Sequence, residues 1–329
     1  MLNIAILALD NCIHSTVSGP FDIFSIAAMH SRESDNDNGG FCSVQIVLPD
    51  ENPVHSFNGL IIDGTKTTKD TDRYDLIMTP ALMGDLSPLL ENSEVIDWII
   101  DQHEEGACIC SVCAGAFLVA KAGLLNGKQA TTHWALADDF KSKFPEVNLK
   151  IEKMLVDEGD IISAGGVTAY LDLCIYIINR FGTPELASSI SKTLLIDTTR
   201  QTQTPYSSYT FRKSHGDEAV LKAQTHLEKM CKSPVKIPDL AAVAGLEERT
   251  FNRRFKKATG ETPTEYIQGL RIENARKLLE TTQEPVDRVT QAVGYEDVSS
   301  FRRLFKQHTG LSPSDYRKRF SVFYRGEHN

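Results

Sequence analysis

A cysteine between small residues is the first group in this 329-residue sequence that could do chemistry. Residues 106–117 read GACICSVCAGAF, an apolar run followed by Cys113 and the start of a predicted helix. A thiol at a strand-to-helix turn lies near free N–H groups and the helix's positive end, which lower its pKa and can hold an anion. Ala114 and Gly115 allow the close approach that a nucleophile elbow requires, with cysteine in the place of serine. Cys113 is therefore a candidate nucleophile, a candidate ligand-binding residue or a redox sensor.

A metal site is an alternative for this stretch, because Cys108, Cys110 and Cys113 are close in sequence. Spacings of two and three residues, without a second pair or a nearby histidine, do not match a zinc ligand set, and buried cysteines in strands are common. Seven cysteines and no export signal favour reduced thiols over a disulfide framework. We expect neither a metal nor a cofactor.

The elements that must position Cys113 alternate between strands and helices over residues 1–196. The expected strands are NIAILAL, CSVQIVL, DLIMTP and ACICSV, and the expected helices begin at Pro20, span 88–105 and begin at 114. This alternation predicts a parallel sheet with helices on both faces, a flavodoxin-like α/β sandwich. Its ligand site should lie at the carboxyl ends of the strands, where Cys113 falls.

The distribution of charge divides the chain into two parts. Residues 1–214 carry a net charge of −13 and residues 215–329 carry +4, which together give the overall −9. A basic part attached to an acidic one is a mild indication of nucleic-acid binding. No apolar stretch reaches the roughly 18 to 20 uncharged residues of a membrane span, and the opening MLNIAILALDNC resembles a first strand, not a signal peptide. The sequence predicts a cytoplasmic protein without membrane contact.

The composition changes after a predicted helix PELASSISKTLLI, which has Thr183 as its cap and Pro184 as its first residue. Residues 197–215 are rich in Thr, Ser and Gln and have neither a helical nor a strand period. We expect this segment to be a linker.

An internal repeat dominates the last third of the chain. FNRRFKKATGETPTEY at 251–266 and FRRLFKQHTGLSPSDY at 301–316 are offset by 50 residues and agree at eight of 16 positions. Phe251 and Phe255, four residues apart, share one face of a helix and can anchor it in a core. Gly260 can adopt the left-handed turn that ends this helix.

Helix caps and glycine turns complete each repeat. Thr262 to Glu265 form a predicted capping box that opens a helix to about Glu280, and Ser312 to Asp315 repeat the pattern. A short helix ending in glycine precedes each unit, LAAVAG at 240–245 and VTQAVG at 289–294. A helix, a glycine turn and a basic helix form the arrangement that enters a DNA major groove. The sequence predicts two helix-turn-helix motifs, at about 237–257 and 286–307.

Residues 216–320 resemble the AraC/XylS DNA-binding domain, an all-α domain of seven helices with two helix-turn-helix units. GYEDVSSFRRLFKQHTGLSPSDYR, from Gly294, carries the most specific part of the resemblance. The resemblance implies that base edges are contacted by Arg249, Thr250, Asn252, Arg253, Ser299, Ser300, Arg302 and Arg303. Phosphates are expected to be contacted by Lys256, Lys257 and Lys306. Two recognition helices imply an asymmetric site read in two major-groove segments about 10 base pairs apart.

The α/β part resembles the ThiJ/PfpI members of the class I glutamine amidotransferase-like fold. The matching stretches are SGPFDIF at 18–24, CAGAFLVAKAGLLNG at 113–127, TTHW at 131–134 and SAGGVTAYLDL at 163–173. A ThiJ/PfpI domain followed by an AraC domain is the architecture of GlxA-type regulators. By this resemblance a ligand pocket would include Thr16, Cys113, Ala114, His133 and Trp134.

Two positions depart from the enzymes of this fold. Thr16 stands where they keep an acidic residue, and Ala114 stands where the protease-like members have a histidine. His133 could lie near Cys113, but the sequence provides no third, orienting acid. His133 and Trp134 could also be a helix cap and a buried aromatic residue. Asp172 is interpreted as a buried carboxylate with a partner, and pairing with a cationic effector is the alternative.

Two hypotheses follow. The first is a transcription regulator, not an enzyme, that binds double-stranded DNA and a small-molecule effector and forms a homodimer through its α/β domain, with RNA polymerase as a candidate partner. The resemblance to GlxA-type regulators points to a nitrogen-containing effector. The second is a cysteine-dependent hydrolase or glyoxalase-like enzyme with an appended DNA-binding domain, which Thr16 and Ala114 disfavour.

Overall fold

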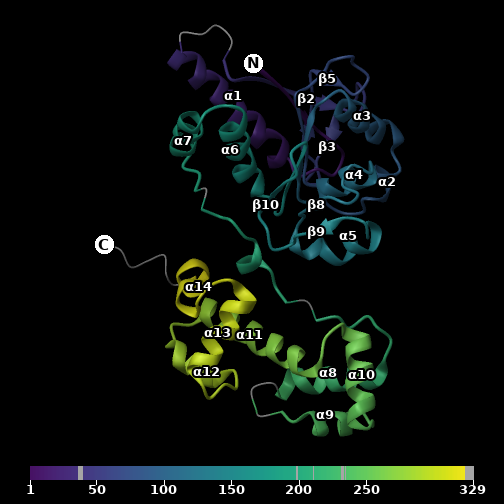
Figure 1. Cartoon of the computed structure of the whole chain (residues 1–329), viewed down its shortest axis with the longest axis vertical. Coiled ribbons are helices and arrows are strands. Elements are labelled where there is room, and N and C mark those ends of the chain that lie inside the picture. The colour runs from purple at the N-terminus through teal and green to yellow at the C-terminus, as the bar shows by residue number, and fades with distance from the viewer. Residues whose placement is uncertain (36–39, 198, 210, 231–232, 234, 323–329) are drawn as a thin grey trace. The chain divides into compact units, whose positions relative to one another are not determined.

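The chain forms two compact units, Met1–Gln203 and Thr204–Asn329. The computed structural model describes residues 1–35, 40–197, 199–209, 211–230, 233 and 235–322 (Figure 1). The boundary falls inside the segment 197–215 that the sequence predicts to be a linker, of which Thr198 and Thr210 lie outside the described residues. The described residues on either side of this boundary contact the unit to which they belong.

A seven-stranded sheet forms the centre of the first unit, in the order β10-β11-β7-β6-β1-β2-β5. Its strands are β1 (Leu2–Leu7), β2 (Cys42–Leu48), β5 (Lys66–Thr67), β6 (Leu76–Thr79), β7 (Cys108–Val112), β10 (Leu155–Asp157) and β11 (Ile161–Ala164). Each neighbouring pair is parallel except β10–β11, which is antiparallel. The predicted α/β class is confirmed, but the sheet is mostly rather than wholly parallel, because residues 158–160 are too few for a crossover.

Helices cover both faces of this sheet (Figure 1). One layer consists of α1 (Ser15–Asp35), α6 (Ala169–Phe181) and α7 (Pro184–Thr193), and the other of α2 (Ser87–Leu90), α3 (Ser93–Glu104) and α4 (Ala116–Lys121). Because both faces are covered, the central strands are buried and mostly apolar, and residues 4–7 of β1 are fully buried.

Smaller elements complete the first unit. They are β3 (Val54–His55), β4 (Ile61–Ile62), β8 (Gln129–Ala130), β9 (Asn148–Leu149), α5 (Ala137–Lys143) and the 3-10 turns η1 (Cys113–Gly115) and η2 (Trp134–Leu136). β3 and β4 pair as an antiparallel hairpin, and β8 pairs with β9 in parallel.

Two expected helices have different bounds in the structure. The helix expected from Pro20 begins five residues earlier, at Ser15, and Pro20 lies inside it, where it removes one backbone hydrogen bond without ending the helix. The helix expected over 88–105 is two helices, since the first ends at Leu90 and Asn92 caps the second by accepting a hydrogen bond from Val95 N.

Seven α-helices make up the described part of the second unit. They are α8 (Glu218–Met230), α9 (Ile237–Val243), α10 (Glu248–Thr259), α11 (Pro263–Thr281), α12 (Val286–Ala292), α13 (Val298–Thr309) and α14 (Pro313–Phe320). A 3-10 turn, η3 (Thr204–Tyr206), precedes them. Two separate cores form, one with α8, α9 and α10 and the other with α12, α13 and α14. The two ends of α11 belong to different cores, so this helix joins two halves.

Three further observations concern the described part of the chain. None of its helices combines the length and apolarity needed to cross a bilayer. No cluster of three or more metal-ligating side chains forms there. Its six cysteines are free, and the seventh, Cys231, lies outside the described residues.

Candidate functional sites: the cysteine elbow and two helix-turn-helix units

Cys113 occupies a sharp turn at the carboxyl end of β7. Its φ is +56°, a left-handed conformation that few non-glycine residues adopt. A Cβ on Gly115 would lie 2.6 Å from Pro80 O and from Thr79 Oγ1, so only glycine allows the turn to approach β6 this closely. The strand, the strained residue and the following helical turn have the shape of a nucleophile elbow, as the sequence predicts.

The Cys113 thiol is buried, and this burial decides its protonation. Backbone N–H groups of Ala114 and His133 donate to the sulfur and lower the pKa, but burial outweighs them and raises the pKa to about 11. The expectation that the helix end lowers this pKa is therefore wrong. The free-energy cost of desolvating a thiolate exceeds the stabilisation that two backbone N–H donors give it. The sulfur is therefore a neutral thiol near pH 7.

The other expected pocket residues lie around the same sheet edge, with different contacts. Thr16 is fully buried; its Oγ1 donates to Ile13 O at 2.7 Å and accepts from Ala81 N at 3.1 Å. It thus holds the loop after β6, where the enzymes of this fold place an acid. Among the described residues no hydrogen bond joins Thr16 to Cys113.

His133 meets Cys113 through its backbone, while its ring has a local role. Its Nδ1 accepts a hydrogen bond from Ala135 N at 3.1 Å and caps η2. Burial lowers the pKa of His133, so the ring is neutral near pH 7. Its centroid lies 5.2 Å from that of Trp134. No hydrogen bond in the described part of the chain pairs this imidazole with the thiol as a general base.

Gln203 is a residue at this site that the sequence does not indicate. The residue is 3% exposed. It donates to Thr132 O at 2.8 Å and accepts from Trp134 N at 3.1 Å. Thr132 in turn donates to Cys113 O at 2.7 Å. The last residue of the first unit is thereby hydrogen-bonded to the segment that surrounds the cysteine turn.

The first helix-turn-helix comprises α9 and α10, joined at Gly245, whose φ is +67°. Phe251 and Phe255 are fully buried and anchor α10, with ring centroids 5.4 Å apart. Gly260 ends the helix in the left-handed conformation. Thr262 and Glu265 form the predicted capping box at the start of α11.

The second copy repeats this core through α12, α13 and the turn at Gly294, whose φ is +89°. Phe301 and Phe305 are fully buried, with centroids 5.6 Å apart, and Gly310 ends α13. At the start of α14 the helix cap is simpler than the predicted repeat of the capping box. Ser312 accepts from Asp315 N, but the shorter Asp315 side chain contacts the Ser312 hydroxyl at 2.5 Å.

The expected DNA contacts lie on the outer faces of α10 and α13. All of them are exposed except Thr250 and Asn252, which are half-buried. One exposed guanidinium has a partner, since Arg302 lies 3.3 Å from Asp287 on α12.

Arg254 is a further residue that the sequence analysis missed. Its guanidinium holds both carboxylate oxygens of Asp217, at 2.9 and 2.7 Å. Asp217 also accepts a hydrogen bond from Val220 N at the start of α8. The pair therefore ties the first recognition helix to α8. An Asp just before a helix start is a cap signal, but its partner 37 residues away leaves no local signal.

Comparisons with known sequence families identify both parts. Residues 3–180 match the profile of the DJ-1/PfpI family, and residues 240–319 match that of a helix-turn-helix domain.

Three curated relatives are similar to this chain. "HTH-type transcriptional regulator CdhR" of Pseudomonas aeruginosa is 27% identical over 83% of this chain and 80% of its own length. "HTH-type transcriptional regulator GlxA" of Rhizobium meliloti is 28% identical over 65% of this chain and 66% of its own. "Isonitrile hydratase" of Pseudomonas putida is 30% identical over 53% of this chain and 69% of its own.

A solved structure is similar in fold to this chain. A ThiJ/PfpI family protein from Pseudomonas syringae aligns with a TM-score of 0.52 at 21% identity, over 74% of this chain and 91% of that one.

Proposed function

We propose that this chain, which belongs to the DJ-1/PfpI family and carries a helix-turn-helix domain of the AraC type, is a transcription regulator controlled by a small molecule. This is the GlxA-type architecture. One observation carries the proposal: two copies of one helix-turn-helix core each present a basic helix with exposed arginines. An enzyme would not require this duplication.

On both recognition helices, the type of side chain would decide whether it contacts a base edge or a phosphate. Arg249 and Arg253 on the first, and Arg302 and Arg303 on the second, suit guanine edges, and Asn252 suits adenine. Thr250, Ser299 and Ser300 add shorter contacts. Lys256, Lys257 and Lys306 would pair with phosphates, which strengthens binding to every sequence. We propose an asymmetric site read in two major-groove segments about 10 base pairs apart.

The α/β unit would supply the control. We propose that a nitrogen-containing effector, the class to which the resemblance to GlxA-type regulators points, contacts the sheet edge formed by Thr16, Cys113, Ala114, His133 and Trp134. The Gln203 contacts with residues 132 and 134 support this proposal, because an effector that displaced them would act on the residue adjoining the DNA-binding unit.

The proposal extends to assembly and location. By analogy of fold alone, the α/β unit would form a homodimer, and a monomeric mass for the full chain in light scattering would contradict this. RNA polymerase is the expected partner if the protein activates transcription. A regulator must reach DNA, so we assign it to the cytoplasm.

Selection of binding sites from random DNA tests the function. The full chain is incubated with duplexes that carry a randomised segment, and the retained duplexes are sequenced over several rounds. We expect one enriched asymmetric motif in two parts, one helical turn apart. Retention without any enriched motif would contradict sequence-specific regulation.

The similarity to isonitrile hydratase favours a second candidate, a cysteine-dependent enzyme that acts through Cys113. The raised thiol pKa, Thr16 in the place of an acid and a histidine ring engaged as a cap all weigh against it. Incubation of the full chain with isonitriles, beside Cys113→Ser, decides between the two. We expect no consumption by either protein, and consumption by the wild type alone would establish an enzyme.

A further inference from the structure

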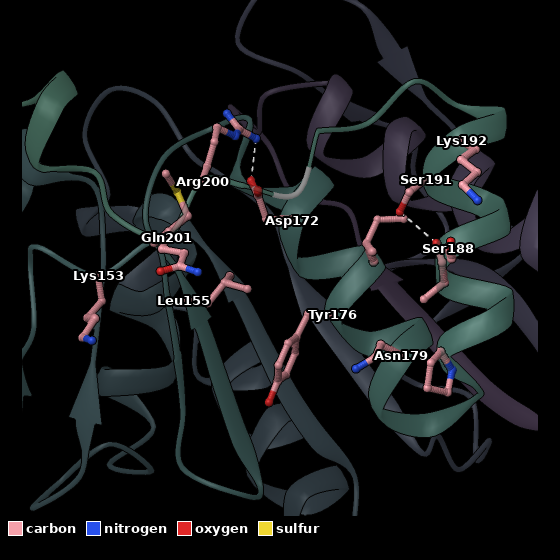
Figure 2. Close-up of a pocket in the computed structure, with 14 residues that line it drawn as sticks. Lys153, Leu155, Asp172, Tyr176, Asn179, Ser188, Ser191, Lys192, Arg200 and Gln201 are labelled. Carbon is pink, nitrogen blue, oxygen red and sulfur yellow. Dashed lines mark hydrogen bonds and ion pairs between the residues drawn. The ribbon is translucent and has the colours of Figure 1, made fainter. Parts of the chain in front are cut away.

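A groove separate from the cysteine turn lies in the α/β unit. Its volume is about 680 Å³, and it is lined by residues of α6, α7, the start of β10 and the segment that leads out of the unit (Figure 2). None of the five residues proposed for the sheet-edge site lines it. The groove is therefore a second candidate site.

Asp172 supplies the unusual feature of this groove. Its side chain is 5% exposed, and its Oδ2 accepts a hydrogen bond from Arg200 Nη2 at 2.5 Å. Its other oxygen, Oδ1, is buried and has no hydrogen-bond partner among the described residues. Burial raises the pKa of this carboxyl, and the opposing effect of Arg200 does not cancel the rise. Buried carboxylate oxygens normally have donors, so a donor from outside the chain would complete this one.

Two lysines set the charge of the groove walls. Lys153 and Lys192 lie on opposite sides of Asp172 in the close-up (Figure 2). Both side chains are exposed, and neither forms an ion pair within the described part of the chain. A simple cation would be repelled by these ammonium groups, and a simple acid would leave Asp172 Oδ1 without a donor. A molecule with both charges meets both requirements.

We propose that this groove binds a small zwitterion whose protonated amine donates to Asp172 and whose acidic group pairs with Lys153 or Lys192. Free amino acids have this chemistry. A quaternary amine does not, because it has no N–H to donate. The binding claim stands on the groove alone and does not depend on DNA binding.

Arg200 links this groove to the segment of the chain that leads into the second unit. Its side chain is 20% exposed and is the outer member of the pair, so it must move for a ligand to reach Asp172. Arg200 also bonds Thr168, through Oγ1 and O at 3.1 Å each, and it lies four residues before Thr204, where the second unit begins. Occupancy would therefore change how this segment is anchored. This consequence, unlike the binding, rests on the proposed function.

Calorimetry and thermal unfolding of the full chain test the binding. The probes are the proteinogenic amino acids, the amines left when their carboxylates are removed, and the N-trimethylated form of the amino acid that binds most tightly. We expect at least one amino acid to bind, and both altered forms to bind at least about tenfold more weakly, since each loses one charge-assisted contact. Failure of every amino acid to bind, or equal binding of the altered forms, would overturn the proposal.

Three variants locate the site. Ser188 is an exposed residue of α7 that lines the groove, so Ser188→Trp should fill the groove and abolish binding. Ser189→Trp makes the same change at an exposed neighbour that does not line it, and should retain binding. Asp172→Asn keeps the shape, removes the charge and should weaken binding about tenfold. Unchanged binding in Ser188→Trp would place the ligand elsewhere.

The same proteins separate this proposal from the proposed function. A chain that selects a DNA motif but binds no amino acid refutes the groove and leaves the regulator. A chain that binds an amino acid in the groove but selects no DNA motif does the reverse.

Discussion

The two halves of the helical unit share a core but differ in what fastens each recognition helix. In both, two phenylalanines four residues apart are fully buried, and the second packs edge-on against a tyrosine of the next helix: Phe255 on Tyr266 at 5.3 Å and Phe305 on Tyr316 at 5.4 Å. The positions that the copies share therefore specify the core.

The positions that they do not share specify the surroundings. Arg254 of the first copy contacts Asp217, the residue before α8, and the equivalent residue of the second copy is Leu304. In the second copy Asp297 caps the recognition helix by accepting hydrogen bonds from Ser299 N and Ser300 N, whereas Glu247 of the first makes no such side-chain bond. The two halves thus share a scaffold, and we expect the positions at which they differ to make them respond differently to sequence, salt and pH.

The largest predicted effect tests whether the cores are separate. Phe255→Ala and Phe305→Ala should each cost about 3–5 kcal/mol, because each empties a fully buried aromatic site. Native-state hydrogen exchange should show each loss only in the half that contains the substitution. Lys256→Ala and Lys306→Ala, on the exposed faces of the same helices, are the controls and should stay within about 0.5 kcal/mol. Equal loss in both halves after one substitution would show a single cooperative core.

The next effect concerns base reading. Arg253→Ala and Arg303→Ala should each cost about 1–3 kcal/mol at the selected site, and each should relax base preference in a different part of the motif. Lys257→Ala should weaken all sequences alike, because a phosphate contact carries no base information. Fluorescence anisotropy on the selected duplex and on random duplexes measures both. Equal losses on the two duplexes for the arginines would refute their assignment to base edges.

A smaller effect should follow from the Arg254–Asp217 ion pair, for which the second half has Leu304 in place of the arginine. Arg254→Leu places the second copy's residue in the first and removes the ion pair with Asp217. Because both charges are partly exposed, salt screens the pair, and the loss should be less than that of a buried phenylalanine. Hydrogen exchange at the start of α8 should accelerate at low salt and less at high salt. Leu304→Arg, the matched exchange, should leave α8 unchanged, and equal protection of α8 in wild type and Arg254→Leu at low salt would contradict the fastening.

The smallest effect is a response to pH confined to the second half. Burial, with a contribution from Arg276, lowers the pKa of His308, and the first copy has Ala258 there. The unfolded chain then binds a proton that the folded chain resists, so stability is complete above pH 6.5 and falls as the pH drops from there toward the lowered value. Exchange rates measured from pH 7 to 5 should show the loss in the second half alone. His308→Ala should remove it, and a slope that persists in this variant would assign it to another group.

Much of the local structure could be predicted from the sequence. The left-handed ends at Gly260 and Gly310, the capping box at Thr262 and the tight turn around Gly115 each depend on residues within a few positions of one another. Glycine, proline and short polar side chains have distinct backbone preferences, which act over that range. The two helix-turn-helix units and the cysteine elbow can be predicted from the sequence for this reason.

The protonation of Cys113 and the direction of strand pairing depend on more than the neighbouring residues in the sequence. A helix end close to Cys113 predicted a lowered thiol pKa, but the amount of protein around the sulfur raises it. The expected parallel sheet gained an antiparallel edge strand, β10, because a short turn reverses the chain. In both cases a local signal was present, and a contribution from the surrounding fold exceeded it.

What the sequence by itself determined is therefore the alternation of strands and helices in the first unit, the repeated helix-turn-helix core of the second and the basic side chains on its recognition helices. The tertiary structure alone decided which distant groups meet: Asp172 with Arg200, Asp217 with Arg254, and Gln203 with the segment around Cys113. The physical reason is distance along the chain. Backbone propensity acts between adjacent residues, whereas desolvation and ion pairing depend on whatever folding brings within a few ångströms, 28 to 71 residues away in these cases.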